Sequence, residues 1–236
     1  MALLNTNGNS AVSATGTLTA GSVSAGTSAL TLGSSGGSVV DDGNSATRIA
    51  AGTLSVNAAG AIGSSGTRLQ TNASTLNANA GSGGIHAHTT ATSSTLSNIV
   101  SGHGPIDITT GGTTSLVTVT SSTSGAGNGI TIATTGNGNL NVGTVNAGSA
   151  GTVSLTTQNG AITSSGVNNV NADTLVARAG GSGAISLRST AAHLDLRPLE
   201  RIEAEAEPTR RSITALEDKI ADLEGIKAIL NQHFLD

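Results

Sequence analysis

The chain has 236 residues, a net charge of −4, 33 glycines, no cysteine, tryptophan or tyrosine, and a single phenylalanine. The lack of cysteine excludes a disulfide scaffold, and the lack of a basic cluster or an aromatic platform argues against nucleic-acid binding. No apolar run approaches the roughly 18 residues of a membrane span, so no transmembrane segment is expected. A core without aromatic volume must be narrow enough for Ala, Val, Leu and Ile to fill it.

Short runs of alternating apolar and polar residues return in pairs about every 22 to 24 residues. The pairs are Leu54–Val56 with Ala61–Ile62, Leu76–Ala80 with Ile85–Ala87, Ile106–Ile108 with Leu116–Val119, Ile130–Ile132 with Leu140–Val142, Val153–Leu155 with Ile162, and Leu175–Ala177 with Ile185–Leu187. A fixed period of this size is typical of a solenoid, in which strands stack on their equivalents in the next coil. We therefore predict an all-β fold, a right-handed parallel β-helix (β-solenoid) of about seven coils, over residues 1–190.

Within this repeat region two segments about 40 residues long resemble each other, which indicates that one copy is two successive coils. The matching stretches are Gly52–Val56 with Gly151–Leu155, Gly60–Gly66 with Gly160–Gly166, and Asn72–Leu76 with Asn171–Leu175. Alternation predicts that Val153 and Leu155 point into the core while Ser154 and Thr156 point outward. Glycine, asparagine and serine supply the turns between the strands.

The regular return of these paired runs is interrupted between Ile85 and Ile106, where about seven extra residues lie near residues 89–104. Insertions in solenoids become loops that bulge from one face, often the face that binds a partner. A tolerated loop without a function is the alternative. The sequence therefore predicts a loop at 89–104.

The composition changes sharply near residue 190, because charged residues dominate from Asp195 to Asp236 and glycine almost disappears. This change predicts a second domain, a charged α-helical tail over residues 191–236. Its apolar residues Ile213, Leu216, Ile220, Leu223, Leu230 and Phe234 follow a heptad that would form an oligomerisation seam, with Lys227 at the intervening a position. Isoleucine at position a and leucine at position d favour a parallel two-stranded coiled coil. A helix folded back as a cap over the last coil is the alternative.

We predict no catalytic residue and no cofactor. Glycoside cleavage requires two suitably spaced carboxylates, and the repeat region has one adjacent acidic pair, Asp41 and Asp42. Gly43 and Asn44 follow this pair, as expected in a turn. The protein is therefore not expected to be an enzyme.

Three histidines are the candidates for a metal site, although none is predicted to form. His86 and His88 are two residues apart, so on one strand they point to the same outer side. His103 follows across the interrupted interval, and three imidazoles together ligate zinc or nickel. Solvated histidines on an exposed strand are the ordinary alternative.

Residues 52–90 and 151–190 resemble the repeat region of filamentous-haemagglutinin-type exoproteins. The resemblance rests on the patterns Gly-Ala-Ile-x-Ser-Ser-Gly, Asn-Ala-x-Thr-Leu and Ser-Gly-x-Ile, and it covers roughly residues 15–190. It implies a right-handed parallel β-helix on a large adhesin that a Gram-negative bacterium exports by two-partner secretion. The amino-terminal secretion domain of that family is not recognisable here, and the charged tail does not match it.

The first functional hypothesis is a non-catalytic structural or adhesive rod of a secreted or cell-surface protein, which associates with itself through its ends or its tail. A host-surface molecule or a glycan is the expected ligand. Met1–Asn5 lacks the features of a signal peptide, which is expected either of a cytoplasmic protein or of a mature fragment of an exported one, and the composition favours the mature fragment. A second hypothesis is a filament subunit that stacks end to end, because open solenoid ends expose unpaired strand edges. A third is a carbohydrate- or ice-binding module, suggested by outward threonines such as Thr118 and Thr120.

Overall fold

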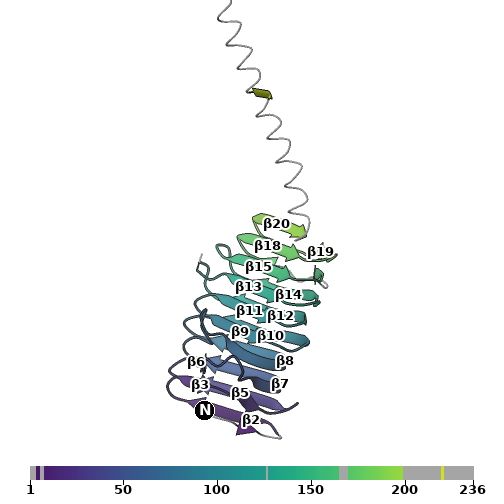
Figure 1. Cartoon of the computed structure of the whole chain (residues 1–236). Coiled ribbons are helices and arrows are strands. Elements are labelled where there is room, and N and C mark those ends of the chain that lie inside the picture. Colours follow the sequence, from purple (N-terminus) through teal and green to yellow (C-terminus); the bar gives the residue numbers. More distant parts are fainter. Residues whose placement is uncertain (1–3, 6–7, 126, 165–169, 199–218, 221–236) are drawn as a thin grey trace, which may run out of the picture. The chain divides into compact units, whose positions relative to one another are not determined.

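The computed structural model describes residues 4–5, 8–125, 127–164, 170–198 and 219–220. In this part the chain forms an all-β parallel solenoid of about eight turns (Figure 1). Every pair of neighbouring strands is parallel. The parallel β-solenoid that the repeat period predicts is therefore present.

The predicted fold class is wrong in its number of coils, and its C-terminal helix is not seen in the described part of the chain apart from two helical residues. The structure has about eight turns where seven were expected, because some turns are shorter than the assumed period: Leu76 pairs with Leu96, and Leu175 pairs with Leu194. In the described part of the chain no helix extends beyond Lys219 and Ile220. Residues 199–218 and 221–236, which hold most of the predicted tail, lie outside the described residues.

One side of the solenoid is built by a first ladder of strands. Its members are β2 (Ser10–Ala14), β5 (Ala29–Ser34), the second halves of β7 (Ile49–Ala58) and β8 (Leu69–Ala80), β10 (Ser93–Ser101), β12 (Thr113–Ser121) and β14 (Leu140–Asn146), followed by β16 (Ile162–Ser164), β17 (Val170–Asn171) and β19 (Ile185–Ser186). The register places leucine on leucine, so that one inward column contains Leu30, Leu54, Leu76, Leu96 and Leu116. All five are at most 3% exposed, and burial of each stabilises the fold by about 1.5–3 kcal/mol.

A second ladder builds the other side. Its members are β9 (Ile85–Thr89), β11 (Ile106–Thr110), β13 (Ile130–Thr134), β15 (Thr152–Thr157), β18 (Thr174–Ala179) and β20 (His193–Pro198). In the first turns shorter pieces lead into it: β1 (Leu4–Asn5), β4 (Val23–Ser24) and the first halves of β7 and β8, together with β3 (Leu18–Ala20) and β6 (Val39–Asp41). Isolated bridges continue from Val39 through Ile62 to Ile85.

The expected alternation along strands is confirmed in β15. Val153 and Leu155 are fully buried, whereas Ser154 and Thr156 are half-buried on the outer side. The same strand ends on an inward residue, Thr157, which is also fully buried. The core is therefore a narrow aliphatic column between the two ladders, with polar residues at its corners.

Buried threonines form one of these corners. Thr71, Thr89, Thr110, Thr134 and Thr157 pair in succession through five turns of the second ladder and its lead-in. Buried hydroxyls need partners, and the neighbouring main chain provides them: Thr110 Oγ1 donates to Ala133 O at 3.4 Å, and Thr134 Oγ1 donates to Gly138 O at 3.2 Å. This threonine corner ties the end of each strand to the adjoining chain.

The predicted loop at residues 89–104 is wrong. Strand β10 occupies most of this interval and pairs with β8 on one side and with β12 on the other. Ile85 pairs with Ile106, so this turn of about 21 residues is shorter than the predicted period of 22 to 24 residues and contains no insertion. A longer turn comes later, where Leu116 pairs with Val142.

A stacked β-bulge explains why this interval appeared irregular. The register shifts between Leu96 and Asn98, which leaves Ser97 unpaired, and the following strands skip the equivalent positions, Val117 and Gly143. A bulge inserts one residue and changes which face the next side chain occupies. Val117 is consequently 51% exposed.

The solenoid continues beyond the boundary that the composition predicts near residue 190. Strand β20 pairs with β18 over its whole length, from the Thr174–His193 pair to the Ala179–Pro198 pair. Met1–Pro198 forms one compact unit and Leu199–Asp236 a second. Charged residues 195 and 197 therefore belong to the last rung of the solenoid.

Candidate functional site

The charged residues of the solenoid are scarce, and several of them gather on the outer side of the second ladder. Arg68 immediately precedes Leu69, which pairs with Ala87, and His86 pairs with Asp107. Arg68, His86 and Asp107 thus occupy one outward column on three successive turns. We call these three residues, together with His88, the charged patch.

Arg68 holds Asp107 by contacts from two of its guanidinium nitrogens. Arg68 Nη2 forms an ion pair with Asp107 Oδ2, and Arg68 Nη1 donates to the main-chain oxygen of Asp107 at 3.1 Å and to Thr109 Oγ1 at 3.3 Å. The two charged side chains are 28% and 26% exposed. Partial burial and several hydrogen bonds make this pair stronger than a solvated surface salt bridge.

The two histidines of β9 lie on the same outer side, as predicted. His86 is 12% exposed, and its Nδ1 lies 3.8 Å from Asp107 Oδ2 without a hydrogen-bond partner. Burial lowers the pKa of His88 below 6.5, and the positive charges of Arg48 and Arg68 lower that pKa further. The patch therefore combines a fixed ion pair with an imidazole that is held neutral.

The third histidine does not join them. His103 lies in the turn before β11, where its main-chain oxygen accepts a hydrogen bond from the Gly83 N–H at 2.8 Å. Across the described ranges, no three His, Cys, Asp or Glu side chains gather closely enough to hold a metal ion. The structure thus brings His86 and His88 together with Asp107 and leaves His103 apart.

A polar hollow of about 280 Å³ adjoins the charged patch. Its lining is Asp41, Gly43, Ser45, Ser65, Gly66, Thr67, Arg68 and Gln70. Asp41 accepts hydrogen bonds from the N–H groups of Gly43 at 2.9 Å and Gln70 at 3.0 Å. The carboxylate on its wall is thus already used to hold the turn after β6 against the next rung.

Asp42 has a similar structural role. Its Oδ1 accepts hydrogen bonds from the Asn44 N–H at 3.0 Å and from Thr47 Oγ1 at 2.7 Å. These hydrogen bonds lower the pKa of Asp42, so the side chain remains ionised and bound to its own turn. The interpretation of Asp41–Asp42 as a turn is confirmed.

A second ion-pair network lies on the last rungs of the same ladder. Arg178 forms an ion pair with Asp195 and donates to the main-chain oxygen of Asp195 at 2.8 Å, while Arg197 Nε lies 2.9 Å from Asp195 Oδ1. The hydrogen bond from Arg178 is the main cause of the lowered pKa of Asp195. The contacts from Arg178 repeat those between Arg68 and Asp107.

Both ion-pair networks were missed from the sequence. Arg68 and Asp107 are 39 residues apart, which is about two turns, and both residues stand next to apolar residues of a strand. Arg178 and Asp195 are 17 residues apart, and neither separation is a multiple of the 22- to 24-residue period, so the period alone does not pair these charges. Chemically, these side chains offer charged and neutral hydrogen-bonding groups on an outer face.

The predicted oligomerisation seam lies almost entirely outside the described residues. This applies to Ile213, Leu216, Leu223, Lys227, Leu230 and Phe234. Ile220 is described and is 55% exposed. Its exposure shows only that the described residues do not bury this side chain.

No protein-family model, curated protein or solved structure matches this chain. None of the helical residues that the structure describes belongs to a segment long and apolar enough to cross a lipid bilayer. Inferences about function therefore rest on the fold and on the side chains described above.

Proposed function

We propose that this chain is a structural and adhesive rod of a secreted or cell-surface bacterial protein of the filamentous-haemagglutinin type, without catalytic activity. The stacked parallel strands from β2 to β20 are the main support. Each inner rung pairs with the rungs before and after it, so the ladders are continuous. At about 4.8 Å for each of about eight rungs, the solenoid spans about 38 Å.

The outer surface of the first ladder supports the adhesive part of the proposal. One outward column contains Ser55, Asn77, Asn98, Thr118 and Thr144. Hydroxyl and carboxamide groups both donate and accept hydrogen bonds and carry no charge. Such a surface suits adhesion to hydroxyl-rich molecules on a host cell.

The adhesive proposal is tested with the full-length chain coupled to polystyrene beads. We expect coated beads to adhere to cultured epithelial cells more than beads coated with the same protein after denaturation. Negative-stain microscopy of the free protein should show short rods. The absence of both differential adhesion and rods would contradict the proposal.

A filament subunit is a second candidate, favoured by the last rung. Leu194 and Leu196 of β20 are 58% and 41% exposed, although Leu175 and Ala177, with which they pair, are fully buried. Among the described strands, β20 has a partner on one edge only. A free edge beside exposed core residues favours the addition of another strand, here from a second copy of the chain.

The filament candidate is tested by light scattering over a range of protein concentrations. We expect the scattering mass to grow with concentration, and Leu194→Lys, which places a charge on the last rung, to stop that growth. Thr190→Lys adds the same charge outside β20 and should leave assembly unchanged. A monomer at every concentration would exclude the filament while leaving the adhesive rod intact.

A further inference from the structure

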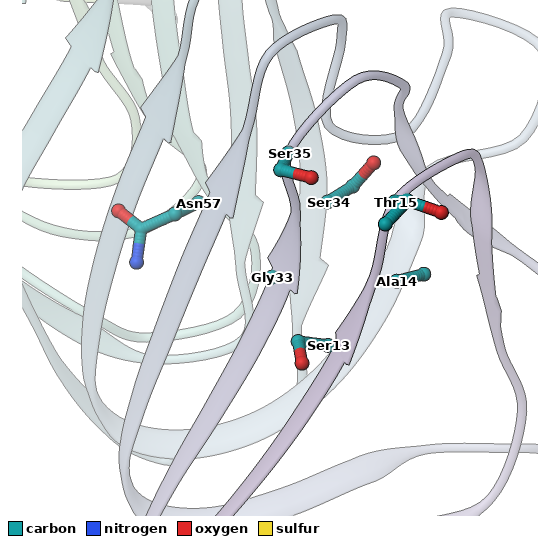
Figure 2. A pocket seen from close by; sticks show the side chains of 7 residues that line it. All are labelled: Ser13, Ala14, Thr15, Gly33, Ser34, Ser35 and Asn57. Carbon is teal, nitrogen blue, oxygen red and sulfur yellow. The ribbon is translucent and has the colours of Figure 1, made fainter.

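An outward column of the first ladder has a gap near the N-terminal end of the solenoid. Ser13, Gly33 and Asn57 pair across β2, β5 and β7. The positions that continue this column are occupied by Asn79, Val100, Thr120 and Asn146. Figure 2 shows Gly33 between the strands that carry Ser13 and Asn57, and the resulting hollow has a volume of about 410 Å³.

The fold does not require glycine at position 33. Its backbone is not in the positive-φ region that favours glycine. A Cβ atom there would lie 3.7 Å from Ser13 Cβ and 3.9 Å from Val12 O, which is ordinary contact. Glycine inside a strand costs stability, and a glycine at such a position often marks a place where another molecule approaches the backbone.

Apart from Ser34, whose Oγ donates to Gly16 O at 2.6 Å, the polar side chains around this gap have no partners within the described structure. The hydroxyl groups of Ser13, Thr15 and Ser35 and the carboxamide of Asn57 line the hollow and make no hydrogen bond to a described residue. At some other positions of the first ladder such groups do pair with each other across rungs. Asn77 Nδ2 donates to Ser55 Oγ at 3.4 Å, and Asn171 Nδ2 donates to Asn146 Oδ1 at 3.0 Å.

The charge and size of the hollow limit what it can bind. Its lining residues are Ser13, Ala14, Thr15, Gly33, Ser34, Ser35 and Asn57, which are all uncharged. No side chain in the lining is therefore available to balance the charge of an anion or a cation. Its volume falls in the range of sites for small molecules. Hydroxyl and amide groups that both donate and accept match the hydroxyls of a sugar.

We propose that the hollow around Gly33 binds a neutral sugar unit, with the sugar ring over the main chain of Gly33. Ser13, Thr15, Ser35 and Asn57 then supply hydrogen bonds to the ring hydroxyls. This inference rests on the proposed adhesive function and names the class of its ligand. The affinity is expected to be weak, about millimolar, because none of the residues that line the hollow carries an aromatic ring to stack on the sugar.

The test is an NMR titration of the full-length, ¹⁵N-labelled chain with cellotriose, maltotriose and chitotriose. We expect at least one of these sugars to give saturable shifts at residues 13–15, 33–35 and 57. Gly33→Asn fills the gap with the side chain found at neighbouring positions, and it should weaken binding at least tenfold. Asn57→Ala should weaken binding several-fold without filling the gap, so it serves if Gly33→Asn fails to fold.

Thr31→Asn is the matched control, because Thr31 is exposed on the same strand but does not line the hollow. It should bind within twofold of the wild type. The proposal is overturned if none of the three sugars gives saturable shifts, if the shifts lie elsewhere, or if Gly33→Asn and Asn57→Ala bind as the wild type does. Such a result would not contradict the adhesive rod, which the bead-adhesion experiment tests separately, since adhesion can use other surfaces.

Discussion

At the scale of single residues, two glycines of the first ladder differ in whether a Cβ atom would fit at their position. A Cβ on Gly143 would lie 2.3 Å from Leu116 O and 2.6 Å from Val117 O, so the stacked bulge requires glycine at this position. Gly33 has room for a side chain. Glycine content by itself therefore does not distinguish a steric requirement from an open site.

We expect Gly143→Ala to lower the free energy of unfolding by about 1–3 kcal/mol, because the new methyl group overlaps main-chain oxygens that cannot move independently. Gly33→Ala should instead raise the free energy of unfolding by about 0.4–1 kcal/mol, because it restricts the unfolded chain. Denaturation in guanidinium chloride measures both variants. Equal effects of the two substitutions would contradict this explanation.

The pKa of His88 predicts a change of stability with pH. Since the pKa is lowered in the folded chain, the unfolded chain takes up the proton first as the pH falls. The contribution of His88 to stability is therefore fully present above about pH 6.5 and is lost as the pH falls through the lower, folded-state pKa. His88→Gln removes this titration and places glutamine beside Gln70, its partner in the ladder.

Melting curves at pH 8 and pH 5 measure the effect. The wild type should lose more thermal stability between these two pH values than His88→Gln does. The difference should be small, because much of the imidazole remains in contact with water. Parallel losses in the two proteins would show that His88 does not carry this pH dependence.

At the scale of strands, the buried threonine corner is the feature that a purely apolar core would lack. Thr114 Oγ1 donates to Thr110 Oγ1 at 2.6 Å inside the solenoid. We expect Thr110→Val to lower the free energy of unfolding by about 1–2 kcal/mol, because buried hydrogen bonds are lost while the volume is retained. Thr118→Val changes an outward residue and should have an effect below about 0.5 kcal/mol. Chemical denaturation of the two variants makes the comparison, and a similar loss in both would contradict it.

Stretches that keep strict alternation could be predicted as strands, whereas β10, at which the bulge begins, could not. Leu140–Val142 and Val153–Leu155 show apolar residues at every second position, and both are parts of strands. In β10 the buried residues Leu96 and Ile99 are three apart, because Ser97 is bulged out between them. Sequence alternation cannot reveal a bulge, so this strand was interpreted as a loop.

The candidate site could be predicted only within single strands. The shared side of His86 and His88 follows from their spacing of two. The contact of Arg68 with Asp107 depends on the register of three successive turns, and the length of those turns varies. The separation of His103 from the other histidines also depends on register, since His103 stacks beside Gly83 in the turn before β11 and not on the strand that carries His86 and His88.

At the scale of the compact unit Met1–Pro198, the position of its last rung is testable. A chain that ends after Pro198 should keep the strand signal in circular dichroism and the melting temperature of the full chain. A chain that ends after Thr190 loses β20 and uncovers Leu175 and Ala177, which are buried in the full chain. It should melt at a lower temperature. Equal melting temperatures for the two truncations would place the end of the stable core before β20.

The ion pair between Arg68 and Asp107 affects how the solenoid unfolds. Repeat proteins usually open one unit at a time, since each unit contacts its neighbours only. Arg68 passes over the rung of β9 to bind Asp107 on β11. Fraying that advances from the N-terminal end must therefore release this bond before the rung of β9 is freed. The guanidinium group thus links two rungs that are not direct neighbours, so opening the rung of β9 also costs this ion pair.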